Sequence, residues 1–401
     1  MSGSRRIVQF GAGNIGRSFL GQIFARNGWE VVFVDVDAEL IRLLNERGSY
    51  DLLLKHPEGT EERLIVEGVR AVDAADQDAL AAILSETRYV ASSVGASTLP
   101  AIMPPLAAEC RRRLRREPER PPFDLILAEN IHNGAARVRE MLGKLLPPEF
   151  PEEGYPGLIE CSVGKMVPLI PEALRRREPT TVLAEPYNTL IVDRPAWKNP
   201  IPAMTELAPV ENITAYVDRK LFIHNLGHAA TAYLGYLEDP RRMYLWELLE
   251  SEELRDRVRA VMRRSAEALT AEYPTSFRMH DLEEHIDDLL HRFRNRSLGD
   301  TVHRVGRDLP RKLSPDERLV GALRLVDRRG LDTAPLIEVY RAALAFRALD
   351  ENGNLYPADE AFHKTLEKRG VEQVVSEISG IMPGSPLYHS LTVAGDDGVD
   401  S

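Results

Sequence analysis

The first third of the chain alternates short apolar runs with stretches of helical periodicity. Each β-prone run is followed by a segment in which apolar side chains recur at helical spacing, as in residues 15–24 and 40–44. The β-prone runs are residues 7–10, 31–34, 89–95 and 123–128. This alternation predicts an α/β N-terminal domain, a Rossmann-type doubly wound sheet.

A glycine-rich turn separates the first predicted strand from the first predicted helix. Residues 11–16, Gly-Ala-Gly-Asn-Ile-Gly, match the Gly-x-Gly-x-x-Gly pattern of dinucleotide-binding turns, and Asp35 follows at the end of the second strand. The first glycine permits the tight bend, the second lets a pyrophosphate approach the backbone, and the third lets helix and strand pack closely. The pyrophosphate would lie at the helix N-terminus, where free N–H groups favour anions.

The residue at position 35 distinguishes between the two nicotinamide cofactors. A carboxylate accepts hydrogen bonds from the adenosine ribose and repels a 2′-phosphate, so Asp35 predicts NAD rather than NADP. The alternative is a glycine turn with an unrelated aspartate. The residues expected to bind NAD are Gly11, Ala12, Gly13, Asn14, Ile15, Gly16 and Asp35, together with Val94 and Gly95 after a later predicted strand.

The second half of the chain has a different pattern. Prolines cluster at residues 195–202, and strand-like segments largely disappear beyond them, while amphipathic helical spacing dominates. We therefore predict a mostly α-helical C-terminal domain. The expected segments are an NAD-binding Rossmann-type domain at residues 1–197, a mostly helical substrate and catalytic domain at 198–392, and an acidic disordered tail at 393–401.

The composition of the chain limits the classes of partner that it can be expected to bind. The chain has 401 residues, with 51 Lys and Arg against 62 Asp and Glu, so its formal net charge is −11. An acidic balance argues against nucleic-acid or anionic-membrane binding, which both depend on a basic face. The long uncharged run at residues 89–108 is interrupted by serines and prolines, so it is not expected to span a membrane. We expect a small-molecule substrate, and no feature of the sequence indicates an oligomeric state.

One arginine cluster qualifies this charge argument. Five of the six residues 111–116 are arginines, which could line a basic groove. Interleaved aromatic residues are absent and Glu117 follows at once, so we interpret the cluster as the solvated end of a helix.

The number and spacing of the cysteines and histidines argue against disulfide bonds and a metal site. Cys110 and Cys161 are the only cysteines, too few for a disulfide framework or a Cys-rich zinc site, which favours a reducing cytoplasm. The short N-terminal segment also lacks a signal-peptide core. His224 and His228 are four residues apart, but no third ligand is evident, so we expect no metal.

Polar side chains are concentrated in one helical segment of the second half. In an α-helix, Asn225 and His228 would lie about 140° and 80° around the axis from Lys220, so that Lys220 and His228 could share one wall of a cleft. Small residues beside them, including Gly227, indicate a site that a ligand approaches closely. The alternative is an amphipathic helix with ordinary polar surface residues.

Three blocks of the chain together resemble the polyol-specific long-chain dehydrogenases. The blocks are residues 10–17, the run from Lys220-Leu221-Phe222 through Gly227-His228-Ala229 to Gly235, and residues 304–313, which begin Arg-Val-Gly-Arg. They occur in the family's order between about residue 7 and residue 320, which covers most of the chain. The block with Lys220, Asn225 and His228 is the specific one.

The resemblance implies roles for individual residues. Lys220 would be the general base on the alcohol, Asn225 would hold the developing oxyanion, and His228 would contact substrate hydroxyls. Asn130, in Ala128-Glu129-Asn130, matches a further asparagine of the family near the cofactor and the reacting oxygen. Arg304 and Lys312 match basic residues near the family's substrate end, and Arg307 lies between them. The family uses no metal.

The implied activity is NAD-dependent interconversion of a polyol, or polyol phosphate, with the ketose, most closely mannitol 1-phosphate with fructose 6-phosphate. Two alternatives stay open. One is a dehydrogenase or reductase of an unphosphorylated polyol or keto-sugar acid on the same scaffold, where the cations would meet a carboxylate. The other is a non-catalytic NAD-binding protein.

Three segments depart from the pattern of the members that act on mannitol 1-phosphate. Those members tend to show Val-Asp-Arg-Ile-Val-Pro where this chain has residues 163–168, Val-Gly-Lys-Met-Val-Pro. Residues 185–193 also differ, because the family's acid, aromatic and Glu-Trp pattern is replaced by Glu-Pro-Tyr-Asn-Thr-Leu. Leu226 stands where those members tend to have threonine. Substrate identity is therefore less well determined by the sequence than the chemistry.

Overall fold

The computed structural model describes residues 5–129, 131, 133–168 and 170–393. The chain divides into two compact units, Met1–Val217 and Asp218–Ser401. The first unit thus extends past the boundary predicted at residue 197. Most of the expected acidic tail, residues 394–401, lies outside the described residues.

The first unit contains the strands of both sheets. They are β1 (Arg6–Phe10), β2 (Glu30–Asp35), β3 (Ser49–Lys55), β4 (Glu61–Glu67), β5 (Val69–Asp73), β6 (Tyr89–Ser92), β7 (Asp124–Leu127), β8 (Gly157–Val163), β9 (Val182–Ala184), β10 (Leu190–Asp193) and β11 (Leu207–Val210). Its helical elements are η1 (Gly16–Gly21), α1 (Gln22–Arg26), α2 (Ala38–Arg47), α3 (Gln77–Glu86), α4 (Leu99–Arg116), α5 (Gly134–Gly143), η2 (Glu152–Gly154) and α6 (Glu172–Arg177).

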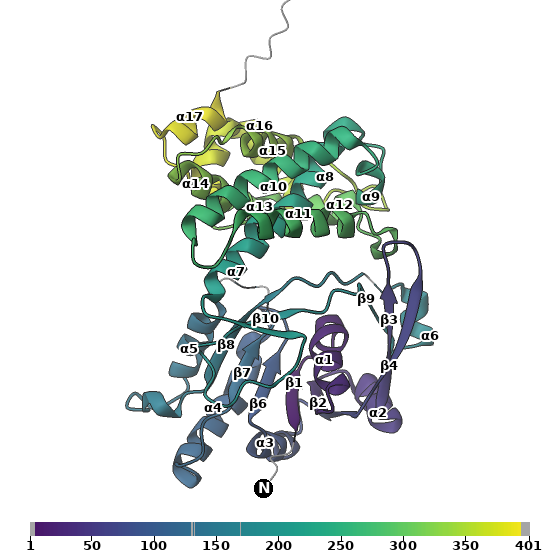
Figure 1. Cartoon of the computed structure of the whole chain (residues 1–401), viewed down its shortest axis with the longest axis vertical. Coiled ribbons are helices and arrows are strands. Elements are labelled where there is room, and N and C mark those ends of the chain that lie inside the picture. Colours follow the sequence, from purple (N-terminus) through teal and green to yellow (C-terminus); the bar gives the residue numbers. More distant parts are fainter. Residues whose placement is uncertain (1–4, 130, 132, 169, 394–401) are drawn as a thin grey trace, which may run out of the picture. The chain divides into compact units, whose positions relative to one another are not determined.

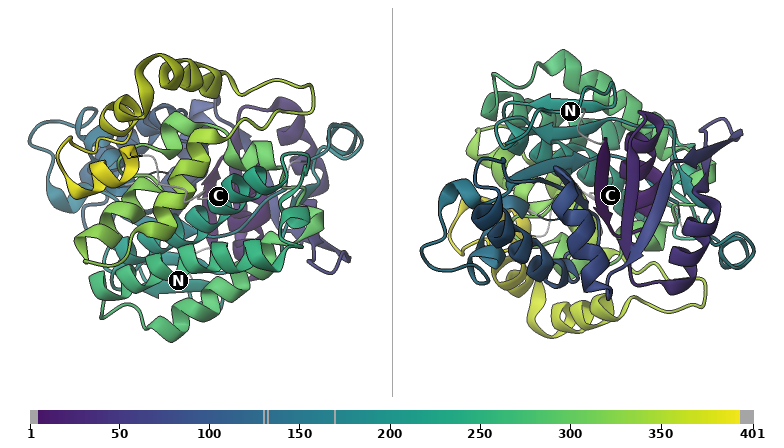
Figure 2. Two further views of the ribbon diagram at one scale, coloured as in Figure 1. Left: turned by 90° about the horizontal axis from the view of Figure 1, so that it is seen from above. Right: turned by 90° about the horizontal axis from the view of Figure 1, so that it is seen from below.

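The main sheet has eight strands in the order β11-β10-β8-β7-β6-β1-β2-β5. The six strands from β5 to β8 are all parallel, and their chain order across the sheet is that of a dinucleotide-binding Rossmann fold. The predicted doubly wound sheet is therefore confirmed. The right-hand view of Figure 2 shows β1 and β2 side by side, with helices on both sides of the strands.

Strands continue beyond the proline cluster, contrary to the sequence-based expectation. β10 pairs antiparallel with β8, and β11 pairs parallel with β10. β11 lies after residues 195–202, so the sheet draws on residues assigned by prediction to the helical domain. A second, smaller sheet has the order β4-β3-β9.

Two separate cores cover the two faces of the main sheet. Because side chains alternate along a strand, Ile7 of β1 packs into one core and Val8 into the other. The core with Ile7 includes Phe19 and Ile23 from the helix after the glycine turn, together with residues of the small sheet. The core with Val8 is completed by α3, α4 and α5. Burial on both faces explains why β1, β2, β6 and β7 appear in the sequence as continuous apolar runs.

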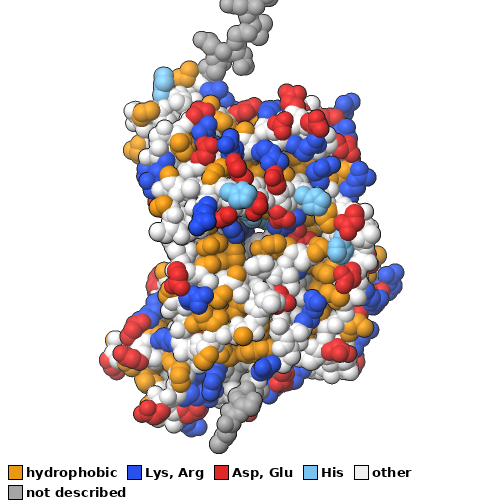
Figure 3. All heavy atoms as spheres, in the orientation of Figure 1, with side chains coloured by type: hydrophobic (Ala, Val, Ile, Leu, Met, Phe, Trp, Pro, Cys, Tyr) orange, Lys and Arg blue, Asp and Glu red, His pale blue; other side chains and the backbone are white. Residues whose placement is uncertain are grey.

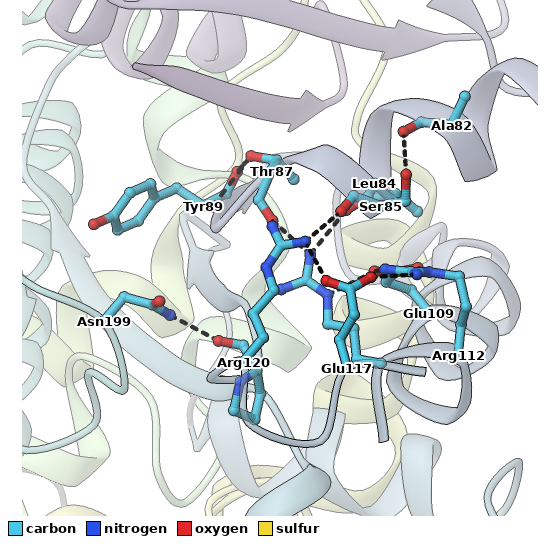
Figure 4. Close-up of polar contacts among 12 residues, drawn as sticks. Ala82, Leu84, Ser85, Thr87, Tyr89, Glu109, Arg112, Glu117, Arg120 and Asn199 are labelled. Atoms are coloured by element: carbon cyan, nitrogen blue, oxygen red, sulfur yellow. Dashed lines mark hydrogen bonds and ion pairs between the residues drawn. The ribbon is translucent and has the colours of Figure 1, made fainter. Parts of the chain in front are cut away.

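The arginine cluster forms ion pairs inside the first unit (Figure 4). Arg112 pairs with Glu109 and Glu117, and Arg120 pairs with Glu117. Arg113 is buried, contrary to the predicted solvated helix end, and its guanidinium also pairs with Glu109. Arg113 also donates to the carbonyl oxygens of Leu84 and Thr87, so it holds the end of α4 against the turn that precedes β6.

The second unit is built of helices, as predicted (Figure 1). They are η3 (Lys220–Asn225), α8 (Leu226–Glu238), α9 (Leu245–Leu248), α10 (Glu252–Glu272), α11 (Met279–Phe293), η4 (Arg296–Leu298), α12 (Val302–Gly306), α13 (Leu309–Lys312), α14 (Val320–Arg328), α15 (Ala334–Ala345), α16 (Pro357–Gln373), η5 (Val374–Ile378) and α17 (Pro386–Thr392). Helix α7 (Ile213–Arg219) carries the chain from the first unit into η3.

Helix α8 forms the centre of this unit, and most of its side chains are buried. A side chain at Gly227 would overlap Met262 of α10, and one at Gly235 would overlap Leu248 of α9. The small residue at 227 therefore permits close packing of helices.

On the face in Figure 3, acidic and basic side chains are interspersed over the helical unit. Among the described residues, no helix is both long and apolar enough to cross a bilayer.

Candidate active site

The glycine turn follows β1 and has the geometry that each glycine predicts. Gly11 has a φ of +88°, which favours glycine, and a Cβ there would lie 2.9 Å from the carbonyl oxygen of Ser93. A Cβ at Gly16 would overlap the carbonyl oxygen of Gly11. At Gly13, by contrast, a Cβ would meet no described protein atom within 4 Å. Packing within the protein thus accounts for Gly11 and Gly16, whereas no described atom of the protein requires glycine at position 13, where the backbone lies open to a ligand.

Asp35 ends β2 and holds this turn. Its carboxylate accepts hydrogen bonds from the backbone N–H groups of Ala12 at 2.7 Å, Val36 at 2.8 Å and Asp37 at 3.1 Å. An ionised carboxylate offers about four acceptor positions, so these three bonds leave capacity for a ribose hydroxyl. The carboxylate also keeps negative charge where a 2′-phosphate would lie, which fits NAD.

Arg17 supports the turn from within the first unit. Its Nε donates to the carbonyl oxygen of Ala12 at 2.6 Å, and its Nη1 donates to that of Thr180 at 2.7 Å. Burial lowers the pKa of Arg17 to about 10, so the guanidinium stays charged at neutral pH. In the helix that follows, residues 14–15 are α-helical and residues 16–21 form a π-helix, η1, where a regular α-helix was predicted.

Glu129 performs a similar role at the neighbouring strand and was missed by the sequence reasoning. It accepts hydrogen bonds from the N–H groups of Val94 and Gly95, each at 2.9 Å, and from the hydroxyl of Ser92 at 2.6 Å. The position of an acid directly after a predicted buried strand was the available signal. Asn130, the next residue, lies outside the described residues.

These features lie at the carboxyl ends of β1, β2 and β6. The chain order of the sheet reverses between β1 and β6, and such switch points are where doubly wound sheets bind ligands. The predicted set from Gly11 to Gly16, Asp35, Val94 and Gly95 is thus gathered along one edge. The residues present fit a dinucleotide, since Gly13 leaves the backbone open to a pyrophosphate and Asp35 matches a ribose.

In the second unit, Lys220 and Asn225 lie at the two ends of the π-helical turn η3. The N–H of Leu226 is shared between the carbonyl oxygens of Ile223 and Leu221, three and five residues back, whereas an α-helix uses the carbonyl four residues back. Residues five apart therefore lie one above the other, and the 140° separation expected between Lys220 and Asn225 does not hold. π-Turns inside α-helices are frequent at functional sites.

The exposure of the side chains in this segment agrees with one shared face for Lys220, Asn225 and His228. Between residues 220 and 230, all of which the structure describes, the side chains of Lys220, Leu221, Asn225 and His228 are partly exposed and every other residue is buried. The three predicted polar residues therefore open to the same side of the helix.

His228 is connected to Arg304 through a residue that the sequence reasoning missed. The Nε2 atom of His228 lies 3.0 Å from Oδ2 of Asp300, and Oδ1 of Asp300 accepts a hydrogen bond from Nη2 of Arg304. The imidazole of His228 stacks on the ring of Phe293, with centroids 4.8 Å apart and planes 26° apart. The spacing of four between Asp300 and Arg304, typical of an ion pair on a helix, was the available signal.

His224 lies behind this cluster. Its ring centroid is 6.4 Å from that of His228, and burial lowers the pKa of His224 well below its usual value, so it is neutral. Among the residues that the structure describes, no three His, Cys, Asp or Glu side chains gather as a metal site would require.

The other two predicted cations differ in their surroundings. Lys312 is only 4% exposed, and its ammonium donates to the carbonyl oxygens of Val305 and Arg307 at the end of α12. Burial lowers the pKa of Lys312 well below its usual value. Arg307 is exposed, with its guanidinium 5.2 Å from the ring centroid of Tyr356. The structure thus brings Arg304 to His228 and turns Lys312 into the protein.

Two of the three departures from the family pattern contact each other in the first unit. The buried ammonium of Lys165 donates to the carbonyl oxygen of Tyr187 at 2.8 Å and lies 3.4 Å from the side-chain oxygen of Asn188. Gly164 faces the ring of Tyr187, where a Cβ would lie 3.4 Å from Cε1. Residues 164–165 and 187–188, where the sequence was expected to depart from the family pattern, therefore pack together.

Family models match both units. The model of the mannitol dehydrogenase Rossmann domain matches residues 5–206, and that of the mannitol dehydrogenase C-terminal domain matches residues 212–385. Together with the glycine turn, Asp35 and the switch-point sheet, these matches define an NAD-dependent polyol dehydrogenase. The chain belongs to the mannitol dehydrogenase family.

The relatives are similar along nearly their whole length. The mannitol-1-phosphate 5-dehydrogenase of Streptococcus mutans is 31% identical over 392 residues, which cover 97% of this chain and 98% of the relative. That of Brevibacillus brevis is 32% identical over 95% of each chain, and that of Geobacillus stearothermophilus is 30% identical over 95% of this chain and 96% of its own.

Two solved structures share the fold. A D-sorbitol dehydrogenase in substrate-free form superposes with a TM-score of 0.79 at 16% identity, over 96% of this chain and 91% of the other. The Pseudomonas fluorescens mannitol 2-dehydrogenase, in a ternary complex with NAD and D-mannitol, superposes with a TM-score of 0.75 at 18% identity, over 98% and 91%.

Proposed function

We propose that the chain interconverts mannitol 1-phosphate and fructose 6-phosphate with NAD as the cofactor. The observation that carries the proposal is the partly exposed face of Lys220, Asn225 and His228, to which Asp300 joins a cation, Arg304. Three relatives named as mannitol-1-phosphate 5-dehydrogenases, each at least 30% identical, support the same substrate. Cys110 and Cys161 are both buried, which fits a reducing compartment, and we place the enzyme in the cytoplasm.

In the proposed oxidation, Lys220, as the neutral amine, takes the proton of the substrate's secondary hydroxyl at its Nζ. Bound NAD, which the glycine turn and Asp35 would hold, would supply the acceptor for the hydride that leaves the carbon of that alcohol. Asn225 and Asn130 donate N–H hydrogen bonds to the oxygen while negative charge develops on it, a contribution that is largest in a site from which water is excluded. The asparagines do the work that a metal ion would do in other dehydrogenases, and we propose that none is used.

The remaining residues orient the substrate. His228 contacts a hydroxyl beside the reacting carbon, and Arg304 and Arg307 bind the phosphate through their planar guanidinium groups. Lys312, which the resemblance assigned to the substrate, is given a supporting role, because its ammonium holds the backbone between Val305 and Arg307.

The test is the oxidation of NADH with fructose 6-phosphate, fructose and a keto-sugar acid in parallel. We expect turnover with fructose 6-phosphate, which Lys220→Ala lowers by about 10²- to 10⁴-fold, the range for loss of a general acid–base group. Calorimetry should show unchanged NADH binding by this variant. Lys364→Ala is the matched control, since Lys364 pairs with Glu360 on an exposed face of α16.

The other outcomes separate the alternatives. Turnover with fructose alone would replace the phosphorylated substrate by a free polyol, and turnover with the keto-sugar acid alone would assign the cations to a carboxylate. Either result would direct attention to residues 164–165 and 187–188, the departures from the family. NADH binding without turnover of any of the three would contradict the enzymatic proposal.

A further inference from the structure

We propose that Asp300 is a positioning residue that fixes the ring proton of His228 and orients Arg304. One buried carboxylate would thereby set both the hydroxyl contact and the anion contact of the polyol site. The inference deepens the proposed function and rests on it for its kinetic part, whereas its structural part concerns the imidazole alone.

The backbone around Asp300 is held rigidly. Asp300 precedes α12 and is 6% exposed. Its carbonyl oxygen accepts a hydrogen bond from the N–H of Leu245 at 3.0 Å, and the N–H of Val302 donates to the carbonyl oxygen of Met243 at 2.8 Å. The two segments, 243–245 and 300–302, therefore form a short bridge that fixes the position of the carboxylate.

The charge of Asp300 determines which nitrogen of His228 carries the proton. Arg304 donates to Oδ1, and this charge-assisted bond favours the ionised carboxylate. An ionised carboxylate only accepts hydrogen bonds. Since Oδ2 lies 3.0 Å from Nε2 of His228, that nitrogen must carry the hydrogen. In the neutral ring, Nδ1 is then the acceptor, which suits a substrate hydroxyl.

The ring plane is fixed as well as the proton. Phe293 stacks against the face of the imidazole at a centroid distance of 4.8 Å, while Asp300 binds its edge. Around the ring lie the neutral His224 and, through Asp300, the cation Arg304. Residues that hydrogen-bond the metal-bound histidines of other proteins typically change activity by about 10- to 100-fold when they are replaced, and we expect an effect of the same size for Asp300.

The first measurement uses the full chain with ¹⁵N-labelled histidine rings. In the unmodified protein, the ring signals that disappear in His228→Gln identify His228, and we expect them to report the form protonated at Nε2. In Asp300→Asn the amide can donate to Nε2, so we expect the proton to move to Nδ1. A proton on Nδ1 in the unmodified protein would overturn the proposal, and this result does not require any variant of Asp300 to fold.

The second measurement is the kinetics of Asp300→Asn with fructose 6-phosphate. We expect kcat to fall by about 10- to 100-fold through His228, and KM for the sugar phosphate to rise through Arg304. The matched control is Asp359→Asn. Asp359 is an equally buried aspartate of the second unit, and it accepts hydrogen bonds from the N–H groups of Asp308 and Leu309 at 3.0 Å and 2.6 Å. This control should leave the proton of His228 and kcat unchanged.

The outcomes are distinguishable. Unchanged kcat and KM in Asp300→Asn, or a loss of kcat with the proton still on Nε2, would overturn the positioning role. A shift of the proton in Asp300→Asn, in a protein whose unmodified form reduces none of the three substrates, would support the role of Asp300 while the proposed function fails.

Discussion

At the scale of single residues, two of the three glycines in the turn, Gly13 and Gly16, lack a side chain for different physical reasons. Gly16 has no room for a Cβ because the carbonyl oxygen of Gly11 occupies the space, whereas the structure describes no protein atom within 4 Å of a Cβ at Gly13. A side chain at position 16 should therefore lower stability, whereas one at position 13 should lower cofactor binding without lowering stability. The pair tests whether the turn binds a dinucleotide without reference to any substrate.

We expect Gly13→Val to lower NAD affinity by about two orders of magnitude, about 3 kcal/mol, because the side chain would occupy the approach of the pyrophosphate. Its melting temperature should stay close to that of the unmodified protein. Gly16→Val should lower the free energy of unfolding by about 1–3 kcal/mol, the usual cost of overpacking, and lose NAD binding as a consequence. Calorimetry and thermal unfolding measure both quantities, and an equal loss of stability at the two positions would contradict this account.

Residue identity and spacing named candidate residues for the chemistry, but they did not reveal which way each side chain points. Asp35, Lys220, Asn225, His228 and Arg304 are all partly exposed, and their roles stay predictions. Lys312 was grouped with Arg304 because both match basic residues of the family, but its ammonium donates to backbone carbonyls inside the protein. The direction of a long cation depends on neighbouring acceptors, which the sequence does not reveal. Asp300 was overlooked for the converse reason, because its importance comes from two partners in space.

At the scale of elements, the π-helical turn η3 determines how Lys220 and Asn225 are presented. A regular α-helix would separate these residues by about 140° around the axis, while the wider turn stacks them. Sequence periodicity could not reveal this, since it assumes a constant number of residues per turn. The extra residue in the turn is thus expected to be required for activity but not for folding.

Deletion of Leu221, the partly exposed residue of the turn, tests this expectation. Loss of one residue should convert the turn to α-helix. Both α7 and α8 should stay helical, and Lys220 should rotate by about 100° relative to Asn225. We expect turnover to fall at least to the level of Lys220→Ala, with NADH affinity and the helical circular dichroism retained. Combining the deletion with Lys220→Ala should not lower turnover any further. Turnover within about threefold of the unmodified protein would show that the π-turn does not position the lysine.

The strands also show how far a local sequence pattern can predict secondary structure. The four strands buried on both faces, β1, β2, β6 and β7, were predicted because their apolar runs are continuous. β4 was not, since most of its residues are exposed and its run of Glu61, Glu62 and Arg63 is charged. β11 was missed because it contains Pro209 and lies at the edge of the sheet, where proline is tolerated. Edge strands depend on a neighbouring strand, and their sequence alone is ambiguous.

At the scale of the whole molecule, the two units contain different groups of candidate site residues. The glycine turn, Asp35 and Glu129 belong to the first unit, and the face of Lys220, Asn225 and His228 belongs to the second. All buried residues of the two cores around the main sheet precede residue 218. The first unit therefore has its own complete sheet, its own cores and every described residue that fits NAD.

It follows that residues 1–217 alone should fold and bind NAD. We expect an affinity within about tenfold of the full chain, a difference of about 1.4 kcal/mol or less, because no described NAD residue is removed. Polyol turnover should be absent, since Lys220, Asn225, His228 and Arg304 are missing. Calorimetry measures binding, and the same fragment with Gly13→Val is the control, which should stay folded and lose NAD. A fragment that folds by circular dichroism yet does not bind NAD would show that residues beyond 217 complete the nucleotide site, and the division of labour between the units would have to be abandoned.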